Sequence, residues 1–448
     1  MSDASTISNP GMGDRARALF GPVRRVAEAA RGPIRAAELD TRLLGMIVAL
    51  AVIWIGFNLV SGGGFLTARN LWNLSVQSAS IAIMATGMVL IIVSRNIDLS
   101  VGSLLGFLGY TMAMAQAVWI PQSLGLGFDQ PFTWIVTLAI GIVLGAILGG
   151  FQGFVVAYGG VPSFIVTLGG LLVWRGLIFS YAQGRTISPL DGTFRLLGGG
   201  PTGSLGEWPS WIVGIVACVA IVFSLYWSRR RRRRYEFQLR PLWAEFALGI
   251  LLCAAVLGTV WVANAYPWPD NLAQQYAAQN DIPVPASGLV IPTGIAFPVL
   301  LMVGVAVVMT YIATRRRFGR NVFAMGGNPE AARLSGINTR RTVMLTFSLM
   351  GILCAISAAV QTARLNSAVT GLGVQNELDV ISAAVIGGTS FSGGIGTIPG
   401  AILGAVVMQS LRSGMLLLRV DAPTQDIVVG IVLVTAVGLD ALLRRRTA

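Results

Sequence analysis

The chain alternates long apolar runs with short polar segments. A helix needs about 17–25 apolar residues to cross the hydrocarbon core of a bilayer. Clear runs of this kind are Leu43–Val60, Trp72–Val93, Ser100–Trp119, Phe132–Ala157, Pro162–Ala182, Trp211–Trp227, Ala244–Ala263, Thr293–Ala313, Thr342–Ala363 and Ile427–Leu443. Between the last two, a short run at Val380–Ser392 precedes a Pro-bearing run from Gly396 to Leu418. We interpret this region, 380–418, as two crossings, the first a partial helix, although a single crossing stays open.

Composition leads to the same class. The 448 residues are 54% hydrophobic and 11% charged, and the mean hydropathy is +0.72. A soluble domain carries about 25% charged residues, which this chain lacks. The prediction is an all-α polytopic membrane protein of about 10–12 transmembrane helices, with broken or half helices, over residues 43–443.

The arginines indicate the orientation. Basic residues gather on the cytoplasmic side of a membrane protein, and here they concentrate in an N-terminal arm (1–42), an Arg-rich turn (228–241), a loop (315–341) and a C-terminal tail (444–448). The prediction is a multi-pass protein with N- and C-termini cytoplasmic. The arm is either a loosely ordered tail or an amphipathic helix at anionic lipid. The Arg229–Arg234 run follows a span directly, so we interpret it as an anchor to lipid headgroups, with no nucleic acid as partner.

The residue inventory restricts the chemistry. Histidine is absent, which removes imidazole metal ligands and the usual base of a nucleophile triad. We therefore expect no catalytic residue and no metal site. No G-x-x-x-x-G-K-[ST] phosphate-binding loop is present either.

Two polar interruptions divide the apolar pattern. In the first, Asp98 and Ser100 are good N-cap types for a helix that restarts near Gly102. They either cap this helix or mark a broken helix beside a translocation pathway. The second interruption contains Gly388, Ser390, Phe391 and Gly393. Breaks at membrane depth are tolerated where protein or a cavity satisfies the backbone, so both stretches are candidates for the pathway. Glycine also serves close helix packing. The small-residue faces are Gly102/Gly106, Gly141/Gly145/Gly149/Gly153 and Gly396/Gly400/Gly404.

A third stretch, 318–338, predicts a short helix between two spans. Asn328 suits a cap, Pro329 the first helical position, and Glu330 the positive end of the helix dipole. Gly336 and Asn338 fit a C-terminal stop. A protein that receives force from a soluble motor needs such a helix, whereas a plain loop does not.

The segment Asn328-Pro329-Glu330-Ala331-Ala332-Arg333-Leu334-Ser335-Gly336-Ile337 resembles the coupling loop of ABC importer permeases in their ribose/xylose branch. Three more segments resemble that branch in the same order along the chain. They are 97–103 (Ile-Asp-Leu-Ser-Val-Gly-Ser), 161–168 (Val-Pro-Ser-Phe-Ile-Val-Thr-Leu), and Glu377-Leu378-Asp379 followed by 387–396. The extra hairpin at Trp211–Ala263 is similar to the longer, xylose-type members.

The resemblance implies an ABC importer permease fold and the membrane channel of a sugar importer, in a bacterial cell (inner) membrane. It implies a homodimer, although a heterodimer with a related permease stays open, a cytoplasmic ABC ATP-binding subunit that holds ATP and Mg, and an extracytoplasmic sugar-binding protein. The sugar would be xylose or another pentose. The residues assigned to the ATPase-coupling loop on this basis are Gly327, Asn328, Glu330, Ala331, Ala332 and Gly336.

Two other classes compete with this reading. An ion-coupled secondary transporter would use Asp98, Glu377 or Asp379 as proton carriers, but each lies near a predicted membrane boundary. An intramembrane serine protease would lack its histidine. Arg175 lies inside a predicted span, where a charge is costly, so it should face the bundle or extend to a boundary.

Overall fold

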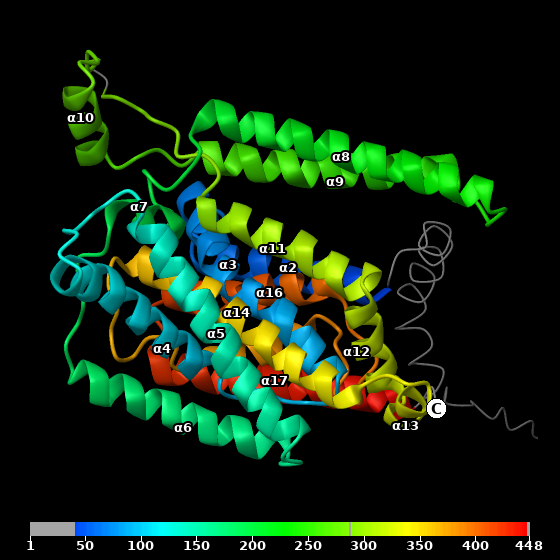
Figure 1. The fold of residues 1–448 in the computed structure, drawn as a ribbon. Helices are drawn as coiled ribbons and strands as arrows, with labels where there is room; N and C mark the ends of the chain where they lie inside the picture. Colours follow the sequence, from blue (N-terminus) through cyan, green and yellow to red (C-terminus); the bar gives the residue numbers. More distant parts are fainter. Residues whose placement is uncertain (1–40, 286–287, 446–448) are drawn as a thin grey trace, which may run out of the picture. The chain divides into compact units, whose positions relative to one another are not determined.

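The computed structural model describes residues 41–285 and 288–445 (Figure 1). Within these ranges the chain is helical and forms no strand beyond isolated bridges. The predicted all-α polytopic class is confirmed. The predictions for the arm 1–42 and the tail 444–448 fall outside the described residues, except that Thr41 begins the first helix and Arg445 ends the last.

Ten helices among the described residues are long and apolar enough to cross a membrane. They are α2 (Thr41–Val60), α3 (Ala68–Val93), α4 (Val101–Met114) with its π-helical continuation η1 (Ala115–Ser123), α5 (Thr133–Ala157), α6 (Ser163–Ala182), α8 (Glu207–Arg234), α9 (Leu242–Asn264), α11 (Phe297–Arg315), α14 (Thr339–Leu365) and α16 (Ile398–Leu417). The protein is therefore a multi-pass membrane protein.

The region predicted as two crossings holds two helices. α15 (Asn376–Ile386) has 11 residues, about 16 Å of helix, whereas the hydrocarbon core is about 30 Å thick. α15 is therefore the expected partial helix, and α16 is full length. The last helix, α17 (Ala422–Arg445), is apolar over Ala422–Thr435.

Five short helices lie outside the spans: α7 (Gly192–Arg195), η2 (Leu196–Gly198), α10 (Asp270–Gln279), α12 (Arg317–Gly327) and α13 (Pro329–Leu334).

The described chain separates into two compact units, one of which contains 213–258. In this unit α8 and α9 form a hairpin. The Sγ of Cys218 lies 3.8 Å from the carbonyl oxygen of Cys253, and Arg229 forms a 2.7 Å ion pair with Glu245. α8 continues through Arg234, so most of the arginines expected in the turn lie in the last turns of a helix.

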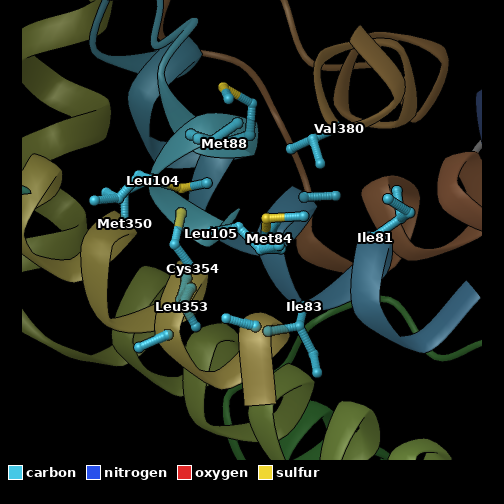
Figure 2. Packing of buried hydrophobic residues seen from close by; sticks show 14 of the residues in the cluster. Ile81, Ile83, Met84, Met88, Leu104, Leu105, Met350, Leu353, Cys354 and Val380 are labelled. Carbon is cyan, nitrogen blue, oxygen red and sulfur yellow. The ribbon is translucent and has the colours of Figure 1, made fainter. Parts of the chain in front are cut away.

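The second unit, which contains 45–212 and the described residues from 259 onward, is organised around α3. Every residue from Ser78 to Val93 is buried. Met84 and Met88 of α3 belong to one buried cluster with Met350 and Leu353 of α14 (Figure 2). This part of α3 is thus surrounded by protein rather than lipid, and it forms the centre of the unit.

Small residues bring α5 and α14 into backbone contact. A Cβ atom at Gly145 or Gly149 would collide with the carbonyl of Gly351 or Phe347, respectively. Without an apolar driving force between lipid-facing helices, such close packing is what holds them together. The predicted packing face on α5 is confirmed.

Candidate functional site

The predicted short helix outside the spans is α13, and a second helix, α12, precedes it directly. The Oδ1 of Asn328 accepts hydrogen bonds from the amides of Glu330 (3.1 Å) and Ala331 (3.0 Å). Pro329 occupies the first turn, and Gly336 follows the end of α13 with φ +79°. The predicted cap and stop are confirmed at these residues. Asn338 instead caps α14, where its Oδ1 accepts from the amide of Arg341.

α13 presents most of its side chains to the outside. Glu330 and Ala331 are exposed, and Leu334 is 84% exposed. Ala332 is the residue that faces inward, at 4% exposure.

The segment before α13 is fixed to the rest of the unit by Arg95. The Nε of Arg95 donates to the carbonyl of Gly326 at 2.7 Å, and its Nη2 donates to the carbonyl of Gly327 at 2.9 Å. The loop between α15 and α16 is also bound to the end of α3, because the amide of Gly394 donates to the carbonyl of Val93 at 3.0 Å.

The first interruption forms a buried polar cluster rather than a helix cap. Ser100 makes no side-chain cap to α4. Its amide and hydroxyl both donate to the Oδ1 of Asp98, at 2.9 and 2.6 Å, and the Nε2 of Gln152 donates to its hydroxyl at 3.0 Å. Of the two alternatives left open above, a side-chain cap from Ser100 is wrong: its backbone is helical (φ −85°, ψ −10°) rather than extended as in a capping residue, and no amide of α4 donates to its hydroxyl. Asp98 lies between two spans, and burial raises its pKa to about 6.

The second interruption is a compact turn between α15 and α16. The Oγ atoms of Ser390 and Ser392 lie 2.7 Å apart, and the amide of Ser390 donates to the carbonyl of Ile395 at 2.9 Å. Gly388 and Gly393 both have φ +87°, a backbone region that favours glycine.

A polar cavity of about 250 Å³ lies between α3, α14, α15 and α16. Its lining residues are Val76, Gln77, Ser80, Ile81, Val360, Gln361, Arg364, Leu365, Val374, Asn376, Asp379, Gln409 and Arg412. Its volume lies below the roughly 300 Å³ at which sites for drug-sized ligands begin. Four of its eight polar lining residues are amides, one is a serine and three are charged, and none of these thirteen residues is aromatic.

Two hydrogen bonds tie the helices around this cavity together. The Nε2 of Gln409 on α16 donates to the Oε1 of Gln77 on α3 at 2.6 Å. The Nε2 of Gln361 on α14 donates to the Oγ of Ser80 at 2.7 Å. Amides and hydroxyls both donate and accept, so the hydroxyl groups of a neutral ligand could replace these partners.

A charged triad closes one side of the cavity. The Nε of Arg412 lies 2.9 Å from the carboxylate of Asp379, and its Nη1 lies 3.6 Å from that of Asp426 on α17. Arg175, predicted to face the bundle, does so: its Nη1 donates to the carbonyls of Thr370 and Leu372 at 3.2 and 3.1 Å.

None of the predicted pathway residues lines this cavity. Asp98, Ser100, Gly102, Gly388, Ser390, Phe391 and Gly393 are all absent from its walls. Their role in transport stays a prediction. The sequence does contain a signal for the lining residues. Each of three apolar helices carries two polar residues three positions apart. The pairs are Gln77/Ser80, Gln361/Arg364 and Gln409/Arg412, and each pair shares one helix face.

Comparison with known proteins identifies the family. Residues 70–193 and 196–437 match the family described as "Branched-chain amino acid transport system / permease component". The chain is 36% identical over 401 residues to the Xylose transport system permease protein XylH of Haemophilus influenzae, covering 90% of this chain and 96% of the relative. It is 37% identical over 410 residues to XylH of Escherichia coli K12, covering 92% and 94%.

A more distant relative is the Ribose import permease protein RbsC of Escherichia coli K12, 28% identical over 89% of this chain and 92% of the relative. No solved structure matches the chain. With a family match over most of its length and a polytopic helical fold, the chain belongs to the branched-chain amino acid transport system / permease component family.

Proposed function

We propose that this chain is the membrane-spanning permease subunit of an ATP-binding-cassette importer that moves a monosaccharide, xylose or another pentose, into the cytoplasm. The observation that carries the proposal is α13, a capped and exposed helix outside the spans, in a chain whose relatives are sugar permeases. ATP and Mg act on a separate subunit that docks on α13. Both termini and α13 face the cytoplasm of a bacterial cell, on the side given by the arginines.

The cavity between α3, α14, α15 and α16 is the site that the sugar visits during transport. Its amide and hydroxyl lining suits a neutral polyol, because each hydroxyl of a sugar can both donate and accept. Without an aromatic ring in the lining, the cavity offers no apolar platform for the face of the sugar. Such a site holds its ligand weakly, as a pathway requires. Selection of the sugar then rests mainly on an extracytoplasmic binding protein, and two copies of the permease complete the importer.

The test is reconstitution of the chain with its ATPase subunit and its binding protein in proteoliposomes. We expect uptake of labelled xylose only when ATP is supplied to the ATPase. Unlabelled ribose and galactose are added in parallel assays as competitors. Glu330→Arg should abolish ATPase co-purification. Asp270→Arg is the matched control, since Asp270 is also an exposed acidic residue in the first turn of a short helix.

Uptake that needs no ATPase subunit and collapses with the proton gradient would replace this proposal by an ion-coupled secondary transporter. ATP-dependent uptake of a different sugar would keep the importer and change its substrate.

A further inference from the structure

Arg95 occupies a position where glycine is the usual residue. It follows the last turn of α3 with φ +62°. Its amide donates to the carbonyl of Ile92 at 2.9 Å, and the amide of Asn96 donates to that of Ile91 at 3.1 Å. Helices commonly end in this way with a left-handed glycine, because side chains disfavour that backbone region. Arg95 is one of several non-glycine residues with a left-handed backbone in the described chain, and its side-chain contacts set it apart from the exposed Arg419.

The Arg95 side chain joins three segments that are far apart in the sequence. Its guanidinium binds the carbonyls of Gly326 and Gly327, immediately before the cap of α13. A Cβ atom at Gly393 would collide with Arg95 itself, and one at Gly326 with the carbonyl of Val93. The end of α3, the base of α13 and the turn before α16 therefore meet backbone to backbone. We call this junction, formed by Val93, Arg95, Gly326, Gly327, Gly393 and Gly394, the Arg95 clamp.

The two membrane helices that leave the clamp also meet at the cavity. α3 carries Gln77 and α16 carries Gln409, whose side chains are hydrogen-bonded to each other. Gln77 lies roughly 27 Å from Arg95 along α3, at a rise of about 1.5 Å per residue. α3 is continuous from Gln77 to Val93 and buried from Ser78 onward, so we take this stretch to move as one body, and a displacement at the clamp then reaches Gln77.

We propose that Arg95 is the positioning residue that transmits displacement of α13 to α3 and α16, and so opens or closes the Gln77–Gln409 bridge over the cavity. This inference rests on the proposed function. A guanidinium suits the task, since its planar fork makes two hydrogen bonds in fixed directions. When α13 moves, the carbonyls of Gly326 and Gly327 pull Arg95, and α3 follows.

The decisive variant is Arg95→Gly. Glycine keeps the left-handed end of α3 and removes the side chain with its two hydrogen bonds. Relief of the left-handed strain offsets part of that loss, so the thermal unfolding midpoint should change little. We expect sugar imported per ATP hydrolysed to fall roughly tenfold, within the range of ordinary coupling energies. Binding of the ATPase subunit should persist, because the face of α13 is intact.

The matched control is Arg419→Gly. Arg419 also follows a helix, α16, with a left-handed backbone at φ +59°. It is exposed, and within 41–285 and 288–445 its guanidinium has no hydrogen-bond or ion-pair partner. We expect transport per ATP at the wild-type level in this variant. A loss equal to that of Arg95→Gly would overturn the assignment.

A second measurement follows the separation of α3 and α16 at the position of the bridge. Cysteines replace Gln77 and Gln409 in a background without native cysteines, and a short bifunctional thiol reagent reports their proximity with and without ATP. We expect ATP to change the cross-linking yield when Arg95 is present and not in Arg95→Gly. An ATP response of the same size in both proteins refutes the proposal.

If Arg95→Gly fails to accumulate, Arg95→Lys decides the matter, because a lysine keeps the charge but cannot reproduce the two-bond fork. Wild-type coupling in Arg95→Lys overturns the inference, and partial loss supports it. Failure of the proposed function is a separate outcome, since it shows in the unmodified chain as absence of ATP-driven uptake.

Discussion

The Nε2 of Gln409 lies 2.6 Å from the Oε1 of Gln77, which joins α16 to α3 beside the polar cavity. Polar bonds between membrane helices contribute only about 0.6–2 kcal/mol. The bridge therefore adds a small share to the contact between the two helices and is weak enough to open during each transport cycle. The same amides are available to the hydroxyl groups of a sugar once they separate.

Gln409→Leu should weaken the transit of sugar through the cavity. The leucine fills similar space but removes one amide, and a lost hydrogen bond costs about 1 kcal/mol, so we expect the KM for uptake to rise several-fold. Kinetics of labelled sugar uptake in proteoliposomes measure this. Gln425→Leu is the control, because Gln425 donates to the carbonyl of Val420 and lies outside the cavity lining. Equal KM values in the two variants would contradict a role for the cavity.

The ion pair of Arg412 and Asp379 should show strong coupling in stability. Arg412→Met leaves a carboxylate that is 8% exposed without its nearest cation, and such losses cost about 3–5 kcal/mol. Arg412→Met combined with Asp379→Leu should recover most of that loss, since an apolar pair replaces both charges. Thermal unfolding in detergent of the two single variants and the double variant gives the coupling energy. Additive losses would show that the two side chains act independently.

Asp98 should make stability depend on pH. Its pKa rises to about 6 in the folded protein, against about 3.9 in an unfolded chain. The folded state therefore favours the protonated form, and stability falls as the pH rises from about 4 to about 6. Asp98→Asn keeps an oxygen acceptor for Ser100 and removes the ionisation.

The unfolding midpoint of Asp98→Asn should thus exceed that of the wild type above pH 6, by the equivalent of about 2–3 kcal/mol, with the difference vanishing near pH 4. Midpoints recorded from pH 4 to 8 test the window. A wild-type midpoint that rises across this range would have the opposite sign and disprove the assignment. Transport retained in Asp98→Asn would also count against Asp98 as a proton carrier.

Gly351→Ala should separate α14 from α5. A Cβ atom there would collide with the carbonyl of Gly145, and overpacking of this kind costs about 1–3 kcal/mol. Gly150→Ala is the control, because a Cβ at Gly150 meets Ser348 at an ordinary 3.5 Å. Midpoints measured in the same detergent should fall for Gly351→Ala alone. Equal midpoints would show that α5 and α14 tolerate a wider separation.

Local signals in the sequence anticipated individual elements well. Asn328 and Pro329 begin α13 as their residue types suggest, because capping depends on neighbours within one turn. α12 was missed because it is too short for a span, although its buried residues Gly319, Val322, Met325 and Gly326 recur at the three- and four-residue spacing of an amphipathic helix. The sequence left open whether Ser100 caps α4, because the partners of its hydroxyl are Asp98 and Gln152, and Gln152 lies on another helix.

By itself, the sequence determined the polytopic helical class, nearly all of the spans and the short helix α13. These features follow from apolar run lengths and from residues adjacent in the chain, which act whatever the rest of the protein does. The tertiary structure alone decided that Gln77, Gln361 and Gln409 share one cavity, and that Arg95 holds Gly326 and Gly327. Such contacts depend on which faces of distant helices meet. Packing decides which faces meet, and the order of the helices along the chain does not reveal which of them are neighbours.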